Sequence, residues 1–429
     1  MSVVEGKAMT AIADVAASRT FDGVDLHALA AAIQTPFYAY SANAIRQRIA
    51  GLQTAFDGLD HRICYAVKAN SNIAILQLMA HQGIGADIVS VGELQRSLAA
   101  GIPAERIVFS GVGKTREEIG KALAVGVWRF NVESADELAL LEQVAKEQGA
   151  CARAAVRINP DVDAQTHAKI STGKAENKFG VSIDEARRWF VQSSGSAHLR
   201  LDGLHAHIGS QILSLEPFRR ALRRVEDFRR ELVEAGHEIR SVDIGGGLGV
   251  SYRAGLDRPV DVNEYAALVR EIFASFNGTL VLEPGRYLVG EAGILLTRAI
   301  RVKSAGEREF LVVDAAMNDL LRPSLYEAWH DIVPLHDRRE PARYDVVGPV
   351  CETGDTFARD RAMTRCRAGD LLMIGGAGAY GSSMASTYNS RPLTAEVLLD
   401  DGRYAVIRRR QSFAEMVAGE QLPQAWNET

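Results

Sequence analysis

The chain has 429 residues, of which 47% are hydrophobic and 24% charged, and a formal net charge of −5. This composition is typical of a globular protein of about two domains, and it gives no reason to expect nucleic acid or an anionic membrane surface as a partner. No apolar run approaches the roughly 18 residues of a membrane span. The acidic residues near the N-terminus argue against a signal peptide, and widely spaced cysteines without a CxxC pair favour a reduced, cytoplasmic protein.

Strand-like and helix-like segments alternate along most of the chain. A short amphipathic helix is predicted at Leu26–Ile33, and an extended segment follows at Thr35–Tyr40. Strand-like runs then fall at Ile63–Ala69, Ala86–Ser90, Arg106–Ser110, Trp128–Val132, Ala152–Ile158, Leu201–Ile208, Ser241–Ile244 and Thr279–Leu282. Between them, segments such as Ile73–Met79 and Ala135–Val144 carry apolar residues three and four apart, which predicts helices.

Eight successive strand–helix units favour a TIM-like (β/α)8 barrel that ends near residue 285. An open doubly wound sheet also alternates strands and helices, and it is the alternative. From Gly293 onward the pattern changes to short strands separated by turn residues, which predicts a β-rich C-terminal region. Its strand-like runs are Leu295–Val302, Phe310–Asp314, Tyr344–Val347, Leu371–Ile374 and Ala395–Leu399.

The run from Ile63 to Asn70 places a lysine at the end of an apolar strand. Asn70 and Ser71 suit the N-cap of the next helix. Partial loss of water around Lys68 would lower its pKa, and a neutral amine can form a Schiff base with an aldehyde. The alternative is a lysine that merely extends from a strand end into solvent.

Polar residues recur where the other predicted strands end. Chemistry in a barrel gathers at this C-terminal face, so the alignment predicts an active site there. The residues are Asp87, Ser90, Asn131, Glu133, Arg157, Asn159, His205, His207, Ser210, Gly245, Gly246, Gly247, Glu283 and Arg286.

Three of these groups suggest a particular ligand. Gly245–Gly247 follows the seventh strand, where backbone N–H groups can bind phosphate, although glycine also serves plain turns. His205 and His207 share one parity and would face the barrel interior, as core residues, metal ligands or a surface for stacking on an aromatic ring. Glu283 could pair simply with Arg286, or keep a pyridine nitrogen protonated. Together with Lys68, they describe a pocket for pyridoxal 5'-phosphate.

The chain resembles the bacterial diaminopimelate decarboxylases, which belong to the alanine-racemase-like, fold-type III class of pyridoxal-phosphate enzymes. The motifs YAVKAN, ADIVSVGEL, HAHIGSQ, DIGGGLG, EPGR, RPSLY, CETGD and GAYGSSMASTYNSRP occur in the family's order, over about residues 20 to 415. The resemblance implies a barrel at 36–285 and a β-rich domain formed by 286–429, with 1–35 packing onto it. It also implies a homodimer whose active site is shared between chains.

The resemblance assigns roles to individual residues. Lys68 would hold the cofactor covalently, His207 would stack on its ring, and Glu283 would pair with the ring nitrogen. The phosphate would be bound by Ser210, Gly245, Gly246, Gly247 and Tyr380, with Arg286 and Tyr380 also reaching the substrate. Cys351 of the neighbouring chain would be the proton donor; from the residues alone it could equally be a buried structural cysteine.

The implied reaction is decarboxylation of meso-2,6-diaminopimelate to L-lysine and CO2, the last step of lysine biosynthesis. Arg322 and Tyr326 resemble the family's clamp for the distal carboxylate, and Glu352 would take the distal ammonium. An arginine guanidinium can bind this distal carboxylate through two hydrogen bonds, and ornithine and lysine have no distal carboxylate.

Three alternatives to this activity stay open. Val91 and Gln34 stand where many relatives have glycine, which leaves room for a decarboxylase acting on carboxynorspermidine or on ornithine, lysine or arginine. An amino-acid racemase would share the barrel, but it would want a weaker electron sink than Glu283 provides. A non-enzymatic, single-domain cofactor-binding protein would lack residues 290–429.

Overall fold

The computed structural model describes residues 19–163 and 178–423, and these fall into two compact units. Of the described residues, one unit contains 42–163, 178–292 and 378–383. The other contains residues 19–41, 293–377 and 384–423. This division differs from the predicted domain boundaries at residues 36–41, which join the second unit, and at residues 286–292 and 378–383, which join the first.

The first unit is a closed barrel of parallel strands, which confirms the predicted barrel and excludes the open sheet. The strand order around it is β10-β11-β4-β5-β6-β7-β8-β9, so consecutive strands are neighbours. Their bounds are β4 (His61–Ala66), β5 (Gly85–Ile88), β6 (Ile107–Phe109), β7 (Arg129–Val132), β8 (Ala152–Arg157), β9 (Leu199–His205), β10 (Ser241–Asp243) and β11 (Thr279–Leu282). Every strand predicted for the barrel is present, with ends shifted by a few residues.

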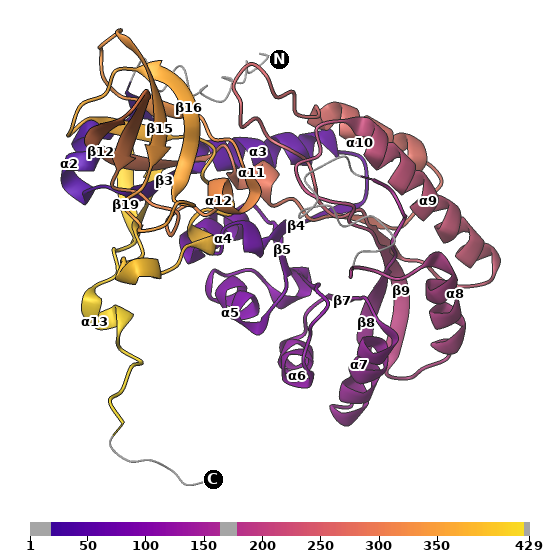
Figure 1. The fold of residues 1–429 in the computed structure, drawn as a ribbon. Helices are drawn as coiled ribbons and strands as arrows, with labels where there is room; N and C mark the ends of the chain where they lie inside the picture. The colour runs from indigo at the N-terminus through magenta and orange to yellow at the C-terminus, as the bar shows by residue number, and fades with distance from the viewer. Residues whose placement is uncertain (1–18, 164–177, 424–429) are drawn as a thin grey trace. The chain divides into compact units, whose positions relative to one another are not determined.

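Helices lie around the outside of these strands (Figure 1). They are α3 (Ala42–Ala55), α4 (Ile73–His81), α5 (Val91–Ala99), α6 (Arg116–Val125), α7 (Ala135–Glu147), α8 (Ile183–Gln192), α9 (Leu215–Glu234), α10 (Val262–Ile272) and the short α11 (Arg286–Val289). Side-chain caps such as Ser90 and Ser134 accept a backbone N–H and begin a helix soon after a strand ends. The cap of α4 is Asn72, not Asn70 or Ser71 as predicted.

The second unit is built on a nine-stranded sheet, which confirms the predicted β-rich region. The main path runs β16-β15-β13-β12-β3-β18-β19, and β17 pairs with β12 and β14. The strands are β3 (Phe37–Ser41), β12 (Gly293–Ala305), β13 (Arg308–Val313), β14 (Ile332–Pro334), β15 (Pro341–Val347), β16 (Thr356–Thr364), β17 (Leu371–Ile374), β18 (Ala395–Asp400) and β19 (Arg403–Arg408). The unit also contains β1 (Thr20–Phe21), β2 (Val24–Asp25), α2 (Leu26–Ile33), α12 (Arg322–Tyr326) and α13 (Phe413–Met416). Its buried core includes Phe37, Leu296, Met373 and Val397.

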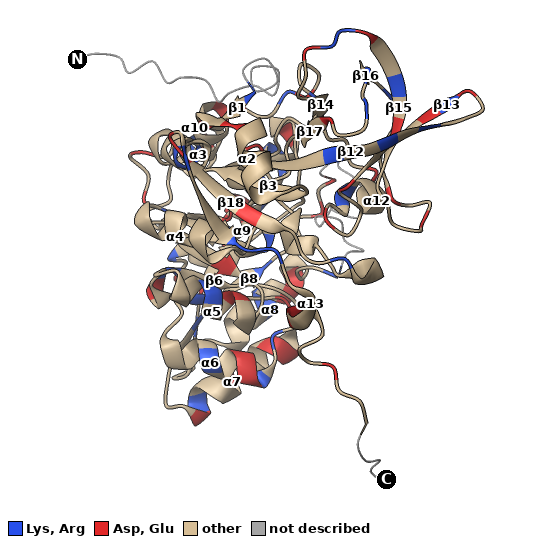
Figure 2. Ribbon diagram, turned by 90° about the vertical axis from the view of Figure 1, so that its left-hand side faces the viewer, with Lys and Arg blue, Asp and Glu red and all other residues tan. Residues whose placement is uncertain are grey.

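Charged residues of both signs are mixed on the outer helices. Blue and red segments both occur in the region of α6 and α7 (Figure 2), where Lys121 pairs with Glu117 at 2.6 Å and Arg116 with Glu147 at 2.6 Å. Such exposed pairs contribute little to stability, about 0–1 kcal/mol each. Among the described residues, no helix combines the length and the hydrophobicity needed to cross a bilayer.

Candidate active site

Lys68 lies just beyond the first barrel strand. β4 ends at Ala66, and Lys68 occupies a short 3-10 turn, Val67–Ala69, rather than the strand itself. Its side chain is 44% exposed, and its Nζ lies 3.4 Å from Oδ2 of buried Asp87. Burial alone would lower the pKa of Lys68, but Asp87 and other nearby acidic groups raise it above the ordinary lysine value. The lowered pKa predicted from the sequence is therefore wrong, because the strand run does not reveal the carboxylate on the neighbouring strand.

Glu283 follows β11 and is buried among hydrogen-bond donors. His205 Nε2 lies 3.2 Å from its Oε2, and its Oε1 accepts from Asn131 Nδ2 at 3.2 Å and from Ser110 Oγ at 3.4 Å. Burial would raise the pKa of Glu283, but His205 and Lys68 outweigh it and hold the pKa below the ordinary value. Glu283 is therefore a buried carboxylate that stays ionised.

Two further carboxyl groups of this buried network behave in the opposite way. Burial and the charge on Glu283 raise the pKa of Asp243 well above its ordinary value and that of Asp87 to about 6. Asn131 Nδ2 also donates to Asp243 Oδ2 at 3.3 Å. The fold thus favours the negative charge on Glu283 over one on Asp243.

His207 and the glycine loop lie next to each other. The N–H of Gly246 donates to His207 Nδ1 at 3.2 Å, so this nitrogen carries no proton. Burial, Arg157 and Lys68 hold the pKa of His207 well below its ordinary value, so the imidazole is neutral. β9 ends at His205, and strand alternation does not extend to His207. His205 contacts Glu283 instead, which supplies in space the carboxylate partner that the sequence around the histidines lacks.

The glycine loop has no room for side chains. Gly245 has a φ of +66°, and a Cβ on Gly246 would lie 2.2 Å from the backbone oxygen of Glu283. These positions are therefore glycine because the loop packs against backbone. Within the loop, the N–H of Gly245 donates to Asp243 Oδ1 at 2.9 Å and that of Gly246 to His207 Nδ1.

A matched pair of glycine replacements tests this packing. Gly246→Ala is expected to lower the free energy of unfolding by about 1–3 kcal/mol, because the clash is with backbone that cannot rotate away. Gly51 lies inside α3, and a Cβ added there would have nothing within 4 Å. Gly51→Ala should therefore raise the free energy of unfolding by about 0.5–1 kcal/mol. Denaturant unfolding of both variants measures the difference. A Gly246→Ala protein as stable as the parent would contradict the packing argument.

Arg286 contacts Ser210, Tyr252 and Tyr380 within the barrel unit. Its Nη2 donates to Ser210 Oγ at 3.1 Å and its Nη1 to the hydroxyl of Tyr252, and its guanidinium lies 4.8 Å from the centre of the Tyr380 ring. The N–H of Tyr380 donates to the carbonyl of Ala69 at 2.8 Å, which ties this late segment of the chain to the turn that carries Lys68. Tyr252 and Ser110 were not predicted, since neither belongs to a recognisable motif.

These side chains fit pyridoxal 5'-phosphate. An amine, a neutral imidazole and a buried carboxylate suit its aldehyde, ring face and ring nitrogen, in that order. An arginine, a serine hydroxyl and a glycine loop without Cβ atoms suit its phosphate.

The other predicted residues lie in the second unit. Arg322 begins α12 and is buried, and its Nη1 lies 2.7 Å from His330 Nε2; Tyr326 ends the same helix and is partly buried. Ser324 Oγ donates to the carbonyl of Gly354 at 2.6 Å, which ties α12 to the turn after Cys351.

Cys351 and Glu352 are both exposed on this turn. Glu352 Oε2 accepts from the hydroxyl of Tyr388 at 2.8 Å, and the N–H of Cys351 donates to Asn389 Oδ1 at 3.3 Å. Asp355 fixes the turn, because its carboxylate accepts the N–H of Val350 at 2.7 Å. Their exposure in a single chain is what residues that act on a neighbouring chain would need.

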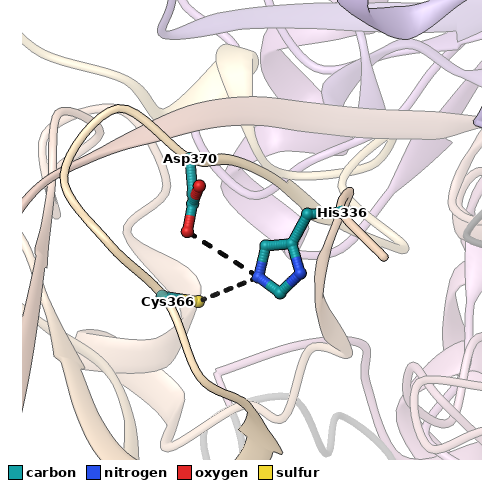
Figure 3. A group of neighbouring side chains, drawn as sticks. All are labelled: His336, Cys366 and Asp370. Carbon is teal, nitrogen blue, oxygen red and sulfur yellow. Dashed lines mark hydrogen bonds and ion pairs between the residues drawn. The ribbon is translucent and has the colours of Figure 1, made fainter. Parts of the chain in front are cut away.

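A second group of reactive side chains lies elsewhere in this unit (Figure 3). His336 Nε2 is 3.9 Å from Cys366 Sγ and 3.7 Å from Asp370 Oδ2. One nitrogen makes both contacts, so the imidazole cannot relay a proton from the thiol to the carboxylate. Arg338 already pairs with Asp370, and burial raises the pKa of Cys366 to about 12, which keeps the thiol protonated. We assign this group to packing of the sheet.

Comparison with known proteins agrees with this geometry. Residues 42–290 match the family described as pyridoxal-dependent decarboxylase, pyridoxal binding domain. The diaminopimelate decarboxylase of Pseudomonas aeruginosa is 48% identical over 402 residues, which cover 94% of this chain and 96% of that protein. That of Zymomonas mobilis is 45% identical over 403 residues, covering 93% and 96%. The crystal structure of the Helicobacter pylori enzyme complexed with L-lysine has a TM-score of 0.89 and 45% identity, and the match covers 92% of this chain and 98% of that one. The chain therefore belongs to the diaminopimelate decarboxylase family of pyridoxal-phosphate-dependent enzymes.

Proposed function

We propose that the chain decarboxylates meso-2,6-diaminopimelate to L-lysine and CO2 with pyridoxal 5'-phosphate as cofactor, as the last step of lysine biosynthesis. The observation that carries this function is the 48% identity that extends over 94% of the chain to a diaminopimelate decarboxylase. All four cysteines are free thiols, which supports action in a reducing compartment such as the cytoplasm.

In the barrel unit, the residues that carry the family's motifs would bind the cofactor. Lys68 would hold it, His207 would present a flat neutral ring to it, and Glu283 would pair with the ring nitrogen as an ionised carboxylate. Its phosphate is held by Ser210, Gly245, Gly246, Gly247, Arg286 and Tyr380. When bound, the cofactor supplies an electron sink for the electron pair left behind by CO2. The protein orients the bond that breaks and excludes water from it.

The second unit supplies substrate specificity and the proton. Arg322 and Tyr326 hold the distal carboxylate, and Glu352 takes the distal ammonium. Arg286 and Tyr380, which belong to the barrel unit, also contact the substrate. Cys351 of a partner chain delivers the proton to the carbon that lost CO2. The active enzyme is accordingly a homodimer with shared sites.

The clamp predicts a selective loss. Arg322→Ala should reduce kcat/KM for diaminopimelate by about 10–100-fold, because an arginine–carboxylate interaction contributes about 1.5–3 kcal/mol. Any activity toward lysine, ornithine, arginine or carboxynorspermidine should change much less. CO2 release from each compound, with chiral analysis of the recovered amino acid to detect racemisation, makes the comparison. Equal losses on diaminopimelate and lysine would remove the clamp, and a parent protein that prefers another compound would overturn the substrate.

The shared site predicts recovery of activity on mixing chains. Lys68→Ala and Cys351→Ala homodimers should each be nearly inactive. Unfolding and refolding them together should restore up to about a quarter of the parent activity, because half of the dimers are then mixed and each has one intact site. If Lys68 and Cys351 acted within one chain, every site would carry a lesion and no activity would return.

A further inference from the structure

His330 makes two hydrogen bonds through its ring. The residue is 1% exposed, and its Nε2 lies 2.7 Å from Arg322 Nη1 while its Nδ1 lies 2.8 Å from the carbonyl oxygen of Gly375. It stands between α12 and β14 in the sequence, and Gly375 directly follows β17. One imidazole thus bridges the start of α12 and the end of a sheet strand.

The two partners determine the protonation of the ring. A guanidinium group can only donate hydrogen bonds, so Nε2 accepts and carries no proton. A carbonyl oxygen can only accept, so Nδ1 carries the proton. Both contacts are satisfied by a single state of His330, the neutral imidazole with its proton on Nδ1.

The backbone around His330 is held as firmly as its ring. Its carbonyl oxygen accepts from Arg361 Nη1 at 2.8 Å, and the Arg361 guanidinium lies 3.5 Å from the centre of the Trp329 ring. The N–H of Gly375 donates to the carbonyl of Asp331 at 2.9 Å. His330 is therefore a rigid support for Arg322, whereas a helix as short as α12 has little stability of its own.

We infer that His330 is a positioning residue for Arg322 and thereby contributes to the preference for a substrate with a distal carboxylate. The inference rests on the clamp role proposed above for Arg322. A neutral acceptor fixes the direction of one of the five N–H groups of the guanidinium and adds no negative charge beside it. A carboxylate in the same place would also orient the guanidinium, but it would repel the substrate carboxylate.

Three replacements of His330 separate orientation from charge. His330→Leu removes the acceptor and should raise KM for diaminopimelate about tenfold, with kcat within about twofold of the parent. His330→Gln places a neutral amide oxygen near the position of Nε2 and should restore KM to within about threefold. His330→Glu, of nearly the same size, adds a charge and should raise KM more than the glutamine does. His336→Leu, another histidine replacement in the same unit, is the control and should leave KM unchanged.

Combination with Arg322→Ala tests whether His330 acts through Arg322. In the Arg322→Ala background, His330→Leu should change KM by less than about twofold. If Arg322→Ala alone leaves KM unchanged, the clamp itself fails. If Arg322→Ala raises KM but His330→Leu does not, or if the two effects multiply, His330 has no positioning role. If His330→Leu does not fold, the glutamine and glutamate pair decides, and equal KM values for these two would overturn the role of charge.

Discussion

Lys68→Ala is expected to abolish both the yellow absorbance of the bound cofactor and CO2 release, with kcat reduced roughly a thousandfold or more. Its ε-amino group is the only proposed covalent attachment, and 44% of the side chain is exposed at the end of β4. Its loss removes the amine while leaving the strand intact. The absorbance spectrum after addition of pyridoxal phosphate, together with a CO2 assay, measures both effects.

The raised pKa of Lys68 adds a condition to this prediction. A lysine beside Asp87 is protonated at neutral pH, so reaction with an aldehyde requires its proton to leave first. Lys121→Ala, on the exposed face of α6, is the matched control and should keep both the colour and the activity of the parent. A Lys68→Ala protein that releases CO2 as fast as the parent would refute the covalent attachment.

The barrel could be predicted because its signals are local. Each strand and helix has its own periodicity, and parallel strands joined by helices close in sequence order. The second sheet is different, because its pairings join distant segments. β3 was predicted as an extended segment, but nothing in Phe37–Ser41 reveals that it pairs with β12 and β18. β19 was not predicted either, and Arg408 at its end lies 3.1 Å from buried Glu396 on β18, a contact that the local sequence does not reveal.

In the candidate site, too, some features are local in the sequence and others depend on contacts between distant segments. Lys68, Glu283 and the glycine loop stand at strand ends and could be identified from that position alone. The residues that contact these side chains come from other strands or from loops without a motif. Asp87 reverses the predicted direction of the pKa shift of Lys68, and His330, which follows α12 in the sequence, supports Arg322. The strand end around Lys68 indicates loss of water from the amine, but the carboxylate beside it belongs to another strand. Hydrogen-bond partners of this kind require the three-dimensional pairing of strands.

Glu283→Gln is expected to lower kcat by about 100–1,000-fold while the protein still folds and binds the cofactor. The amide has nearly the size of the carboxylate and can still accept from Asn131 Nδ2, so the packing is preserved. What is lost is a full negative charge in a buried site, and removal of one such electrostatic contact typically costs about 2.7–4 kcal/mol of transition-state stabilisation. Steady-state kcat and the absorbance spectrum of the variant test the two parts of this expectation.

The buried network explains why no neighbouring group can take over from Glu283. His205, Asn131 and Ser110 all direct donors to this one carboxylate, whereas burial and the charge on Glu283 raise the pKa of Asp243 and disfavour a negative charge there. Glu283→Asp keeps the charge, but its shorter side chain moves the carboxylate away from these donors. The kcat of this variant should therefore lie between that of the parent and that of the glutamine variant. Glu117→Gln, in an exposed pair on α6, should leave kcat unchanged. A Glu283→Gln enzyme with kcat within about threefold of the parent would mean that the strength of the electron sink does not depend on a charge at this position.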